Sequence, residues 1–225
     1  MINAVLHSKV EEAIRNLDID EMIDIPTHEI SSALTEAQLI MVNNYYASFE
    51  INEKARKCLT KLVKPYDSID NVPFDYIPNA TKWELPLDTL YLLKEEALIN
   101  KDKNGNYTNV ESRMNRCIVK PIRLDDYTTN IDNPFKKPYK DVVWRLDISN
   151  AENISSILVC DNNTIIKKYS IVYLSKPIDI DIENYPFMES MIHPDFHLEL
   201  VSMAVDILKQ RLINNQIFAN RITPK

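Results

Sequence analysis

The chain has 225 residues, of which 45% are hydrophobic and 26% charged, and its formal net charge is −7. This composition is typical of a globular protein. The negative charge disfavours a nucleic-acid-binding groove, because an acidic surface repels phosphate. A single glycine, Gly105, excludes the glycine-rich loops that bind phosphates and dinucleotides, and also the nucleophile elbow of serine hydrolases.

The three cysteines, Cys58, Cys117 and Cys160, are widely separated and odd in number. They predict small buried side chains in a reducing compartment rather than a disulfide framework. The sequence has no apolar run of about 18 residues, so we expect no membrane span. Its first residues lack the basic and apolar pattern of a signal peptide.

The first third of the sequence predicts helices. Between residues 3 and 17 the apolar residues recur at spacings of three and four, which places them on one helix face. Thr35 and Gln38 have the spacing of a capping box, so a second helix is expected from Thr35 to about Val63, ended by Pro65. Apolar residues lie on more than one side of this long helix, which favours a partner subunit.

The middle of the sequence predicts a small sheet. Residues 65–86 alternate prolines with aromatic residues, which favours an extended connector. Apolar runs then predict strands at residues 87–99, 117–120, 142–148, 154–160 and 164–174. The first run also fits a helix, but the Asn104-Gly105 turn signal that follows it favours a strand. Residues 161–163 predict a hairpin between the last two strands.

The end of the sequence predicts a helix over residues 194–215. Pro194 suits a first helical turn and Asp195 adds favourable negative charge there. The expected fold is a single α+β domain over residues 1–225, with a helical N-terminal third, a small mostly antiparallel β-sheet and a C-terminal packing helix. Its expected parts are a helical region (1–64), a proline-rich connector (65–86), a β-rich core (87–183) and the C-terminal helix (194–215).

Two surface features are candidate sites. Residues 178–183 alternate with period two, which predicts a strand with the carboxylates of Asp179, Asp181 and Glu183 on one face. Such a row can bind magnesium or serve acid–base chemistry, but it also suits a solvated edge strand. The second feature mixes rigid, aromatic and basic residues and favours docking on a protein; it comprises Pro134, Phe135, Lys136, Lys137, Pro138 and Tyr139.

Two alternatives concern enzymes and DNA. His193 and His197 lie one helical turn apart, so a metal-dependent hydrolase is one alternative, although helix capping and packing explain these residues more simply. Lys136, Lys137 and Lys140 among aromatic residues are the basis of a DNA-binding alternative. No catalytic arrangement, cofactor site or metal site is otherwise expected.

Several segments, in this order along the chain, resemble a known family. These are Leu34-Thr35-Glu36-Ala37-Gln38, Leu85-Pro86-Leu87-Asp88, Asn133-Pro134-Phe135-Lys136-Lys137-Pro138 with Val143-Trp144-Arg145-Leu146, Tyr169 to Ile178, and Ile192 to Val201 with Ala204-Val205. The order resembles the ring and head–tail connector proteins of crAss-like tailed bacteriophages, and the likeness covers most of residues 34–212.

The resemblance implies a non-enzymatic virion structural protein. Such a protein is a subunit of an oligomeric ring, commonly dodecameric, in the portal–tail connector, through which double-stranded DNA passes without specific binding. The implied partners are further copies of the chain, the portal and neighbouring tail ring proteins, with no membrane and no cofactor. The implied location is the virion, after synthesis in the host cytoplasm. Asp179, Asp181 and Glu183 are then candidates to line the lumen. A cargo or fibre-attachment protein is the alternative within the virion.

Overall fold

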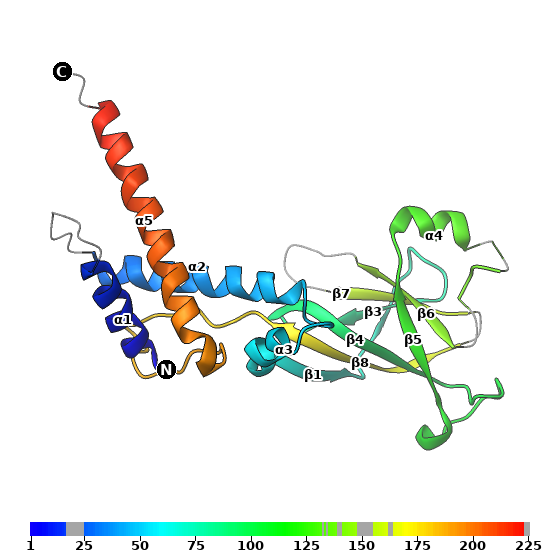
Figure 1. Cartoon of the computed structure of the whole chain (residues 1–225). Helices are drawn as coiled ribbons and strands as arrows, with labels where there is room; N and C mark the ends of the chain where they lie inside the picture. The colour runs from blue at the N-terminus through cyan, green and yellow to red at the C-terminus, as the bar shows by residue number, and fades with distance from the viewer. Residues whose placement is uncertain are drawn as a thin grey trace. The chain divides into compact units, whose positions relative to one another are not determined.

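The structure is a computed structural model, and it describes residues 1–16, 25–131, 133, 135–138, 141–147, 155–161 and 164–222, with side chains of the last helix described as far as Ile213. Over these ranges the α-helices are α1 (Asn3–Arg15), α2 (Thr27–Tyr46), α3 (Glu53–Leu59), α4 (Leu124–Asn130) and α5 (His197–Ile222) (Figure 1). The strands are β1 (Val63–Ser68), β2 (Val72–Pro73), β3 (Ala80–Glu84), β4 (Thr89–Ile99), β5 (Asn115–Pro121), β6 (Val142–Asp147), β7 (Ser155–Val159) and β8 (Ile166–Ser175). Short 3-10 helices lie at Thr60–Leu62, Glu111–Arg113 and Pro194–Phe196.

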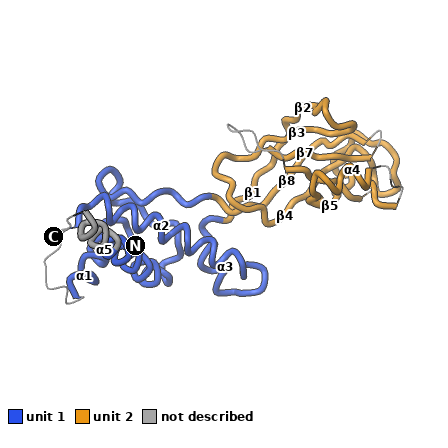
Figure 2. Tube along the Cα trace, turned by 90° about the horizontal axis from the view of Figure 1, so that it is seen from above, with its two compact units in different colours: residues 1–62, 176–225 blue, residues 63–175 orange. Residues whose placement is uncertain are grey.

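The chain divides into two compact units (Figure 2). The helical unit comprises residues 1–62 and 176–225, and the sheet unit comprises residues 63–175. This division confirms the α+β class, but it places residues 176–183 with the helices instead of in the expected β-rich core. That the two units act as a single domain stays a prediction.

In the helical unit, α2 packs against α1, α3 and α5. The apolar stripe of α5, which includes Leu200, Ala204 and Leu208, is buried, and so are Ala33, Leu34 and Met41 of α2. The long helix expected from residue 35 to residue 63 is wrong: α2 begins at Thr27 and ends at Tyr46, and α3 is a separate helix. Several sides of α2 are apolar because neighbours within the unit cover them, so this pattern no longer favours a partner subunit.

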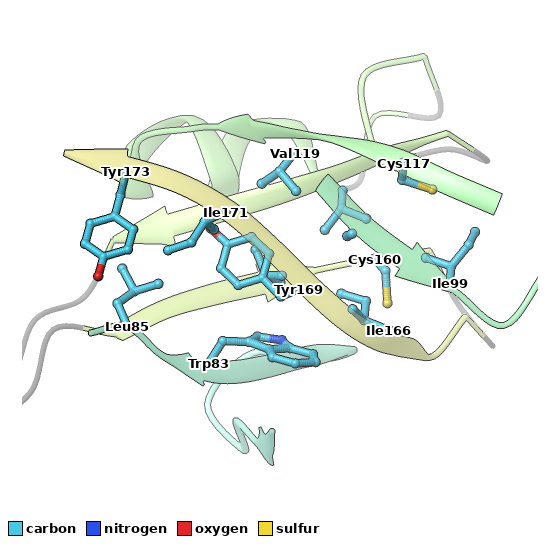
Figure 3. Close-up of a cluster of buried hydrophobic side chains, with 13 residues drawn as sticks. Trp83, Leu85, Ile99, Cys117, Val119, Cys160, Ile166, Tyr169, Ile171 and Tyr173 are labelled. Atoms are coloured by element: carbon cyan, nitrogen blue, oxygen red, sulfur yellow. The ribbon is translucent and has the colours of Figure 1, made fainter. Parts of the chain in front are cut away.

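The sheet unit is built on one eight-stranded sheet of order β1-β8-β4-β5-β6-β7-β3-β2. The β5–β6 pair is parallel and the remaining pairs are antiparallel. The sheet curls on itself: Trp83 of β3 and Tyr169 of β8 stand far apart in strand order, yet their ring centroids are 6.0 Å apart (Figure 3). The opposite face packs beneath α4, where Tyr127 lies edge-on to Trp144 at 6.3 Å.

Residues 65–86 contain the end of β1 and all of β2 and β3, so this range belongs to the sheet and the expected extended connector is wrong. Pro65 lies in β1 and Pro73 in β2, and these are the two edge strands of the sheet. A proline cannot donate a ladder hydrogen bond, so it is tolerated at an edge, where one side of the strand is unpaired. Pro65 and Pro73, which suggested a connector, instead lie in the two edge strands of the sheet.

The hairpin expected around residues 161–163 is also wrong. The flanking strands β7 and β8 both form, but β7 pairs with β6 and β3, whereas β8 pairs with β1 and β4. The turn at Gly105 is confirmed: its φ is +88°, and its N–H donates to the Asp102 carbonyl at 2.9 Å. The helix expected at residues 194–215 forms as a 3-10 turn followed by α5.

Candidate functional site

The acidic segment 178–183 does not form the expected strand. The described residues 176–184 are an irregular segment and a turn that lie along α2. The Ile180 N–H donates to the Thr35 hydroxyl at 2.9 Å, and the Gln38 amide donates to the Ile178 carbonyl at 3.1 Å. Thr35 and Gln38 are thus mid-helix residues that bind this segment, and the capping box expected from them is wrong.

Although they do not share a strand, Asp179, Asp181 and Glu183 meet at one groove. Its volume is about 530 Å³, and Glu36 of α2 adds a fourth carboxylate to its lining. Ile180, which is buried, and Leu39, which is half-buried, supply the apolar part of the lining. We refer to these six residues as the acidic groove.

The carboxylates of the acidic groove differ in how far they are compensated. Asp181 accepts from the Asn184 side chain at 2.6 Å and from the Asn184 N–H at 3.0 Å, and these bonds hold the pKa of Asp181 below its usual value. Glu36 pairs with Arg211 of α5 at 2.6 Å. Asp179 and Glu183 are exposed and form no ion pair with any described residue. The groove therefore keeps free negative charge beside an apolar floor.

The second candidate region, the expected docking loop, is described only in part. Pro134 and Tyr139, and also Lys140, lie outside the described residues. Phe135 is 97% exposed. Its N–H donates to the Asn133 side chain at 3.0 Å, and the N–H groups of Lys136 and Lys137 donate to the Asn133 carbonyl at 3.1 and 3.0 Å. Residues 135–137 therefore form a turn, here called the Phe135 turn, that exposes an aromatic side chain followed by two exposed lysines.

The histidines have local structural roles. The Asp195 N–H donates to His193 Nδ1 at 3.3 Å, which caps the start of the 3-10 turn. His197 is fully buried, with Nε2 at 2.9 Å from the Ile192 carbonyl and Nδ1 at 2.7 Å from the Met1 nitrogen. Burial holds the pKa of His197 below its usual value. The expectation of capping and packing is confirmed for these two residues.

The described part of the chain contains no group of three or more histidine, cysteine or acidic side chains placed to hold a metal ion. All three cysteines are buried free thiols, as expected, and burial raises the pKa of Cys58 and Cys117 to about 12 and that of Cys160 to about 11. None of the described helices is both long and apolar enough to cross a bilayer.

A buried polar network in the sheet unit was not expected from the sequence. Arg145 of β6 pairs with Glu95 of β4, and each side chain is only 11% exposed. The Tyr169 hydroxyl of β8 donates to the same carboxylate at 2.6 Å. Burial opposes the charge on Arg145, but the carboxylates of Glu95 and Asp147 raise the pKa of the guanidinium. One signal was available: Lys94, Glu95 and Glu96 interrupt a strand that is otherwise mostly apolar.

These contacts show what the motif segments do. Arg145 and Tyr169, from two different segments, meet at Glu95 inside the curled sheet. Gln38, from a third segment, accepts from the Ser190 hydroxyl at 3.4 Å and also holds the chain at Ile178. Some motif residues thus stabilise each unit from within, while others, Glu36 in the acidic groove and residues 135–137 of the Phe135 turn, lie at the surface. Such a chain has the features of a structural subunit that binds other proteins.

The comparisons with known proteins agree. A family model described as phage tail ring protein 3/4 matches residues 6–214, and the chain belongs to this family. Ring protein 3 of Bacteroides phage crAss001 is 27% identical over 96% of this chain and 100% of its own length. Ring protein 4/5 of the same phage is 26% identical over 81% of each chain. The family expected from the motifs is confirmed, and the chain is a structural ring protein of crAss-like phages.

Proposed function

We propose that the chain assembles into a closed ring, a dodecamer, in the portal–tail connector of the virion, and that double-stranded DNA passes through this ring. The observation that carries the proposal is the family match, which spans both units. A ring of identical subunits needs two different surfaces on each copy, because one heterologous contact repeats until the rotation closes. The acidic groove and the Phe135 turn are two such surfaces.

The net charge of −7 supports the DNA-passage part of the proposal. An acidic ring repels the phosphate backbone, so DNA can slide through without sticking. Asp179, Asp181 and Glu183 were expected to line the lumen, and that role stays a prediction. The same charge disfavours the DNA-binding alternative, which predicts retention on duplex DNA that falls steeply with salt.

We also propose that the protein has no catalytic role. The hydrolase alternative depends on His193 and His197, whose ring nitrogens contact the Asp195 N–H, the Ile192 carbonyl and the Met1 nitrogen. A cargo or fibre-attachment role in the virion is the alternative that remains, and no described surface favours it over a ring.

The test combines mass with location. Twelve chains of 26.2 kDa give an assembly of about 314 kDa, which mass photometry of the purified chain with its virion neighbours resolves from a monomer. Electron cryomicroscopy of the virion should then place the chain in a ring around the DNA channel. A chain that stays monomeric with its neighbours and is absent from virions contradicts the proposal, whereas a closed ring of another copy number corrects only the symmetry.

A further inference from the structure

We propose that the Phe135 turn of one copy inserts into the acidic groove of the next copy, and that this contact is the repeated interface of the ring. The inference rests on the proposed function, because it names the surfaces that join neighbouring subunits. The partner is a second copy of this chain, because an exposed aromatic side chain followed by two cations complements an apolar floor with a carboxylate rim.

The Phe135 turn has the features of a preorganised anchor. The three hydrogen bonds to Asn133 fix its backbone before any partner binds. Phe135 is 97% exposed, and Lys136 and Lys137 are exposed beside it without an ion pair to any described residue. A rigid aromatic side chain loses little conformational freedom when it is buried, which is why such residues dominate the energetics of protein interfaces.

The acidic groove has matching features. Its apolar residues, Leu39 and Ile180, can receive an aromatic ring, and the uncompensated carboxylates of Asp179 and Glu183 can pair with the two lysines. At about 530 Å³ the groove is large enough to accept a side chain rather than an ion. Opposite charges at the edge of a contact mainly fix its register and speed the encounter, while the buried ring supplies most of the affinity.

A second copy is the favoured occupant because the two complementary surfaces belong to one chain. They also lie in different units, the groove in the helical unit and the turn in the sheet unit. Two distinct complementary surfaces define a heterologous contact, and a heterologous contact is what closes a ring. On this inference Asp179 and Glu183 face a neighbouring subunit and not the lumen, so the two roles predict different results.

The first experiment reverses charge on each side. The full-length Lys136→Glu/Lys137→Glu variant should raise the Kd of the subunit contact about 100-fold, because like charges then face each other. Adding Asp179→Lys and Glu183→Lys in the same chain should restore assembly, since every contact in the ring is complementary again. Lys103→Glu/Lys167→Glu is the matched control: both lysines are exposed, and the net charge changes equally.

Phe135→Ala tests the anchor without a change of charge, and we expect it to raise the same Kd about 30-fold. Assembly is measured by mass photometry across a concentration series, and circular dichroism confirms that each variant is folded. Rings that persist in both Lys136→Glu/Lys137→Glu and Phe135→Ala overturn this inference alone. A wild-type chain that forms no ring, alone or with its neighbours, overturns the proposed function and this inference together.

The second experiment uses cross-linking. Ser32 lines the same groove, so Ser32→Cys combined with Lys137→Cys places one reactive thiol at each proposed surface. The native cysteines are buried and give little background. In assembled protein, a short bismaleimide should join the double variant into a ladder of covalent oligomers, whereas each single-cysteine variant gives no species beyond a dimer. The inference is overturned if the assembled double-cysteine variant gives only monomers after cross-linking. If the groove instead lines the lumen, the double-cysteine variant gives only monomers, and the Lys136→Glu/Lys137→Glu variant assembles normally.

Discussion

Glu95→Ala should strongly destabilise the sheet unit, because Glu95 is the shared partner of Arg145 and Tyr169. The side chains of Arg145 and Glu95 are each 11% exposed, so the variant leaves a guanidinium inside the curled sheet without its nearest carboxylate. Removing one member of a buried ion pair costs about 3–5 kcal/mol. Asp147, with Oδ1 at 2.8 Å from Arg145 Nε, stays in place and compensates part of the charge, so we expect a loss of about 3 kcal/mol in the free energy of unfolding.

The assay can be restricted to this unit because both tryptophans of the chain, Trp83 and Trp144, lie in it. Urea unfolding followed by tryptophan fluorescence therefore reports on the sheet unit. Glu84→Ala is the matched control: Glu84 is exposed on β3, and its loss should change the free energy of unfolding by no more than about 0.5 kcal/mol.

A double variant separates the cost of an unpaired charge from the value of the ion pair. Glu95→Leu/Arg145→Met removes both charges and keeps apolar volume, so it should be less destabilising than Glu95→Ala. Tyr169→Phe should cost about 1–2 kcal/mol, since only one hydrogen bond to a carboxylate is lost. A loss of less than about 1 kcal/mol in Glu95→Ala, or a double variant less stable than the single one, would refute the reasoning.

Three further predictions concern single residues. Gln38→Ala removes a buried amide that donates to the Ile178 carbonyl, and it should lower the free energy of unfolding of the helical unit by about 2 kcal/mol. Far-UV circular dichroism during unfolding measures this change, and an unchanged midpoint contradicts the role of Gln38. The pKa of His197 is lowered in the folded state, so as the pH falls below about 6.5 the unfolded state takes up a proton first. The free energy of unfolding should therefore fall by up to about 1.4 kcal/mol per pH unit until the pH passes the folded-state pKa. His197→Asn should reduce this slope. Gly105→Ala should lower the free energy of unfolding, measured by tryptophan fluorescence, by about 1 kcal/mol, because φ is +88° and no neighbour crowds an added Cβ. Gly105→Asn should lower it by less, and equal losses in the two variants would contradict a backbone-strain origin.

Periodicity predicted the existence of most elements, because burial on one face leaves a direct trace in the sequence. α1, α5 and β4 to β8 all form where apolar spacing placed them. The boundary between α2 and α3 was missed because apolar residues continue through it. The available signal was Asn52, whose side chain accepts from the Lys54 N–H at 2.9 Å and caps α3. A local cap was present, but the apolar run around it suggested one continuous helix.

Strand pairing was less predictable, since it is decided by contacts far apart in the sequence. Residues 161–163 carry a turn signal, and the strands on either side form, yet each pairs elsewhere. Trp83 and Tyr169 explain the outcome: curling the sheet buries both rings in one core, which a β7–β8 hairpin pairing in a flat sheet would not achieve. A local turn preference of about 1 kcal/mol is outweighed by the burial of several aromatic and aliphatic side chains.

The acidic groove shows how a site can be predicted in its residues and missed in its geometry. Period two placed Asp179, Asp181 and Glu183 on one face of a strand, and the structure brings them together on an irregular segment. The segment is irregular because its N–H and carbonyl groups bond to Thr35 and Gln38 of a helix, so no strand partner is needed. Polar residues in the middle of a helix were the signal, but their spacing also fits a cap.

Buried residues stabilise each unit, whereas exposed residues can contact other proteins, and this difference bears on how one tail ring is distinguished from another. The chain is 27% identical to ring protein 3 of Bacteroides phage crAss001 over 96% of its length and 26% identical to ring protein 4/5 over 81%, so percentage identity alone does not separate the two relatives. Glu95 stabilises the sheet unit from within, and Gln38 does the same in the helical unit, so neither residue is placed to choose a neighbouring ring. We expect exposed side chains that meet a neighbour to distinguish one ring from another. Phe135 lies in one of the segments that resemble the family, whereas Asp179 and Glu183 lie between such segments, so it is at these two exposed carboxylates that we expect subunits of different rings to diverge.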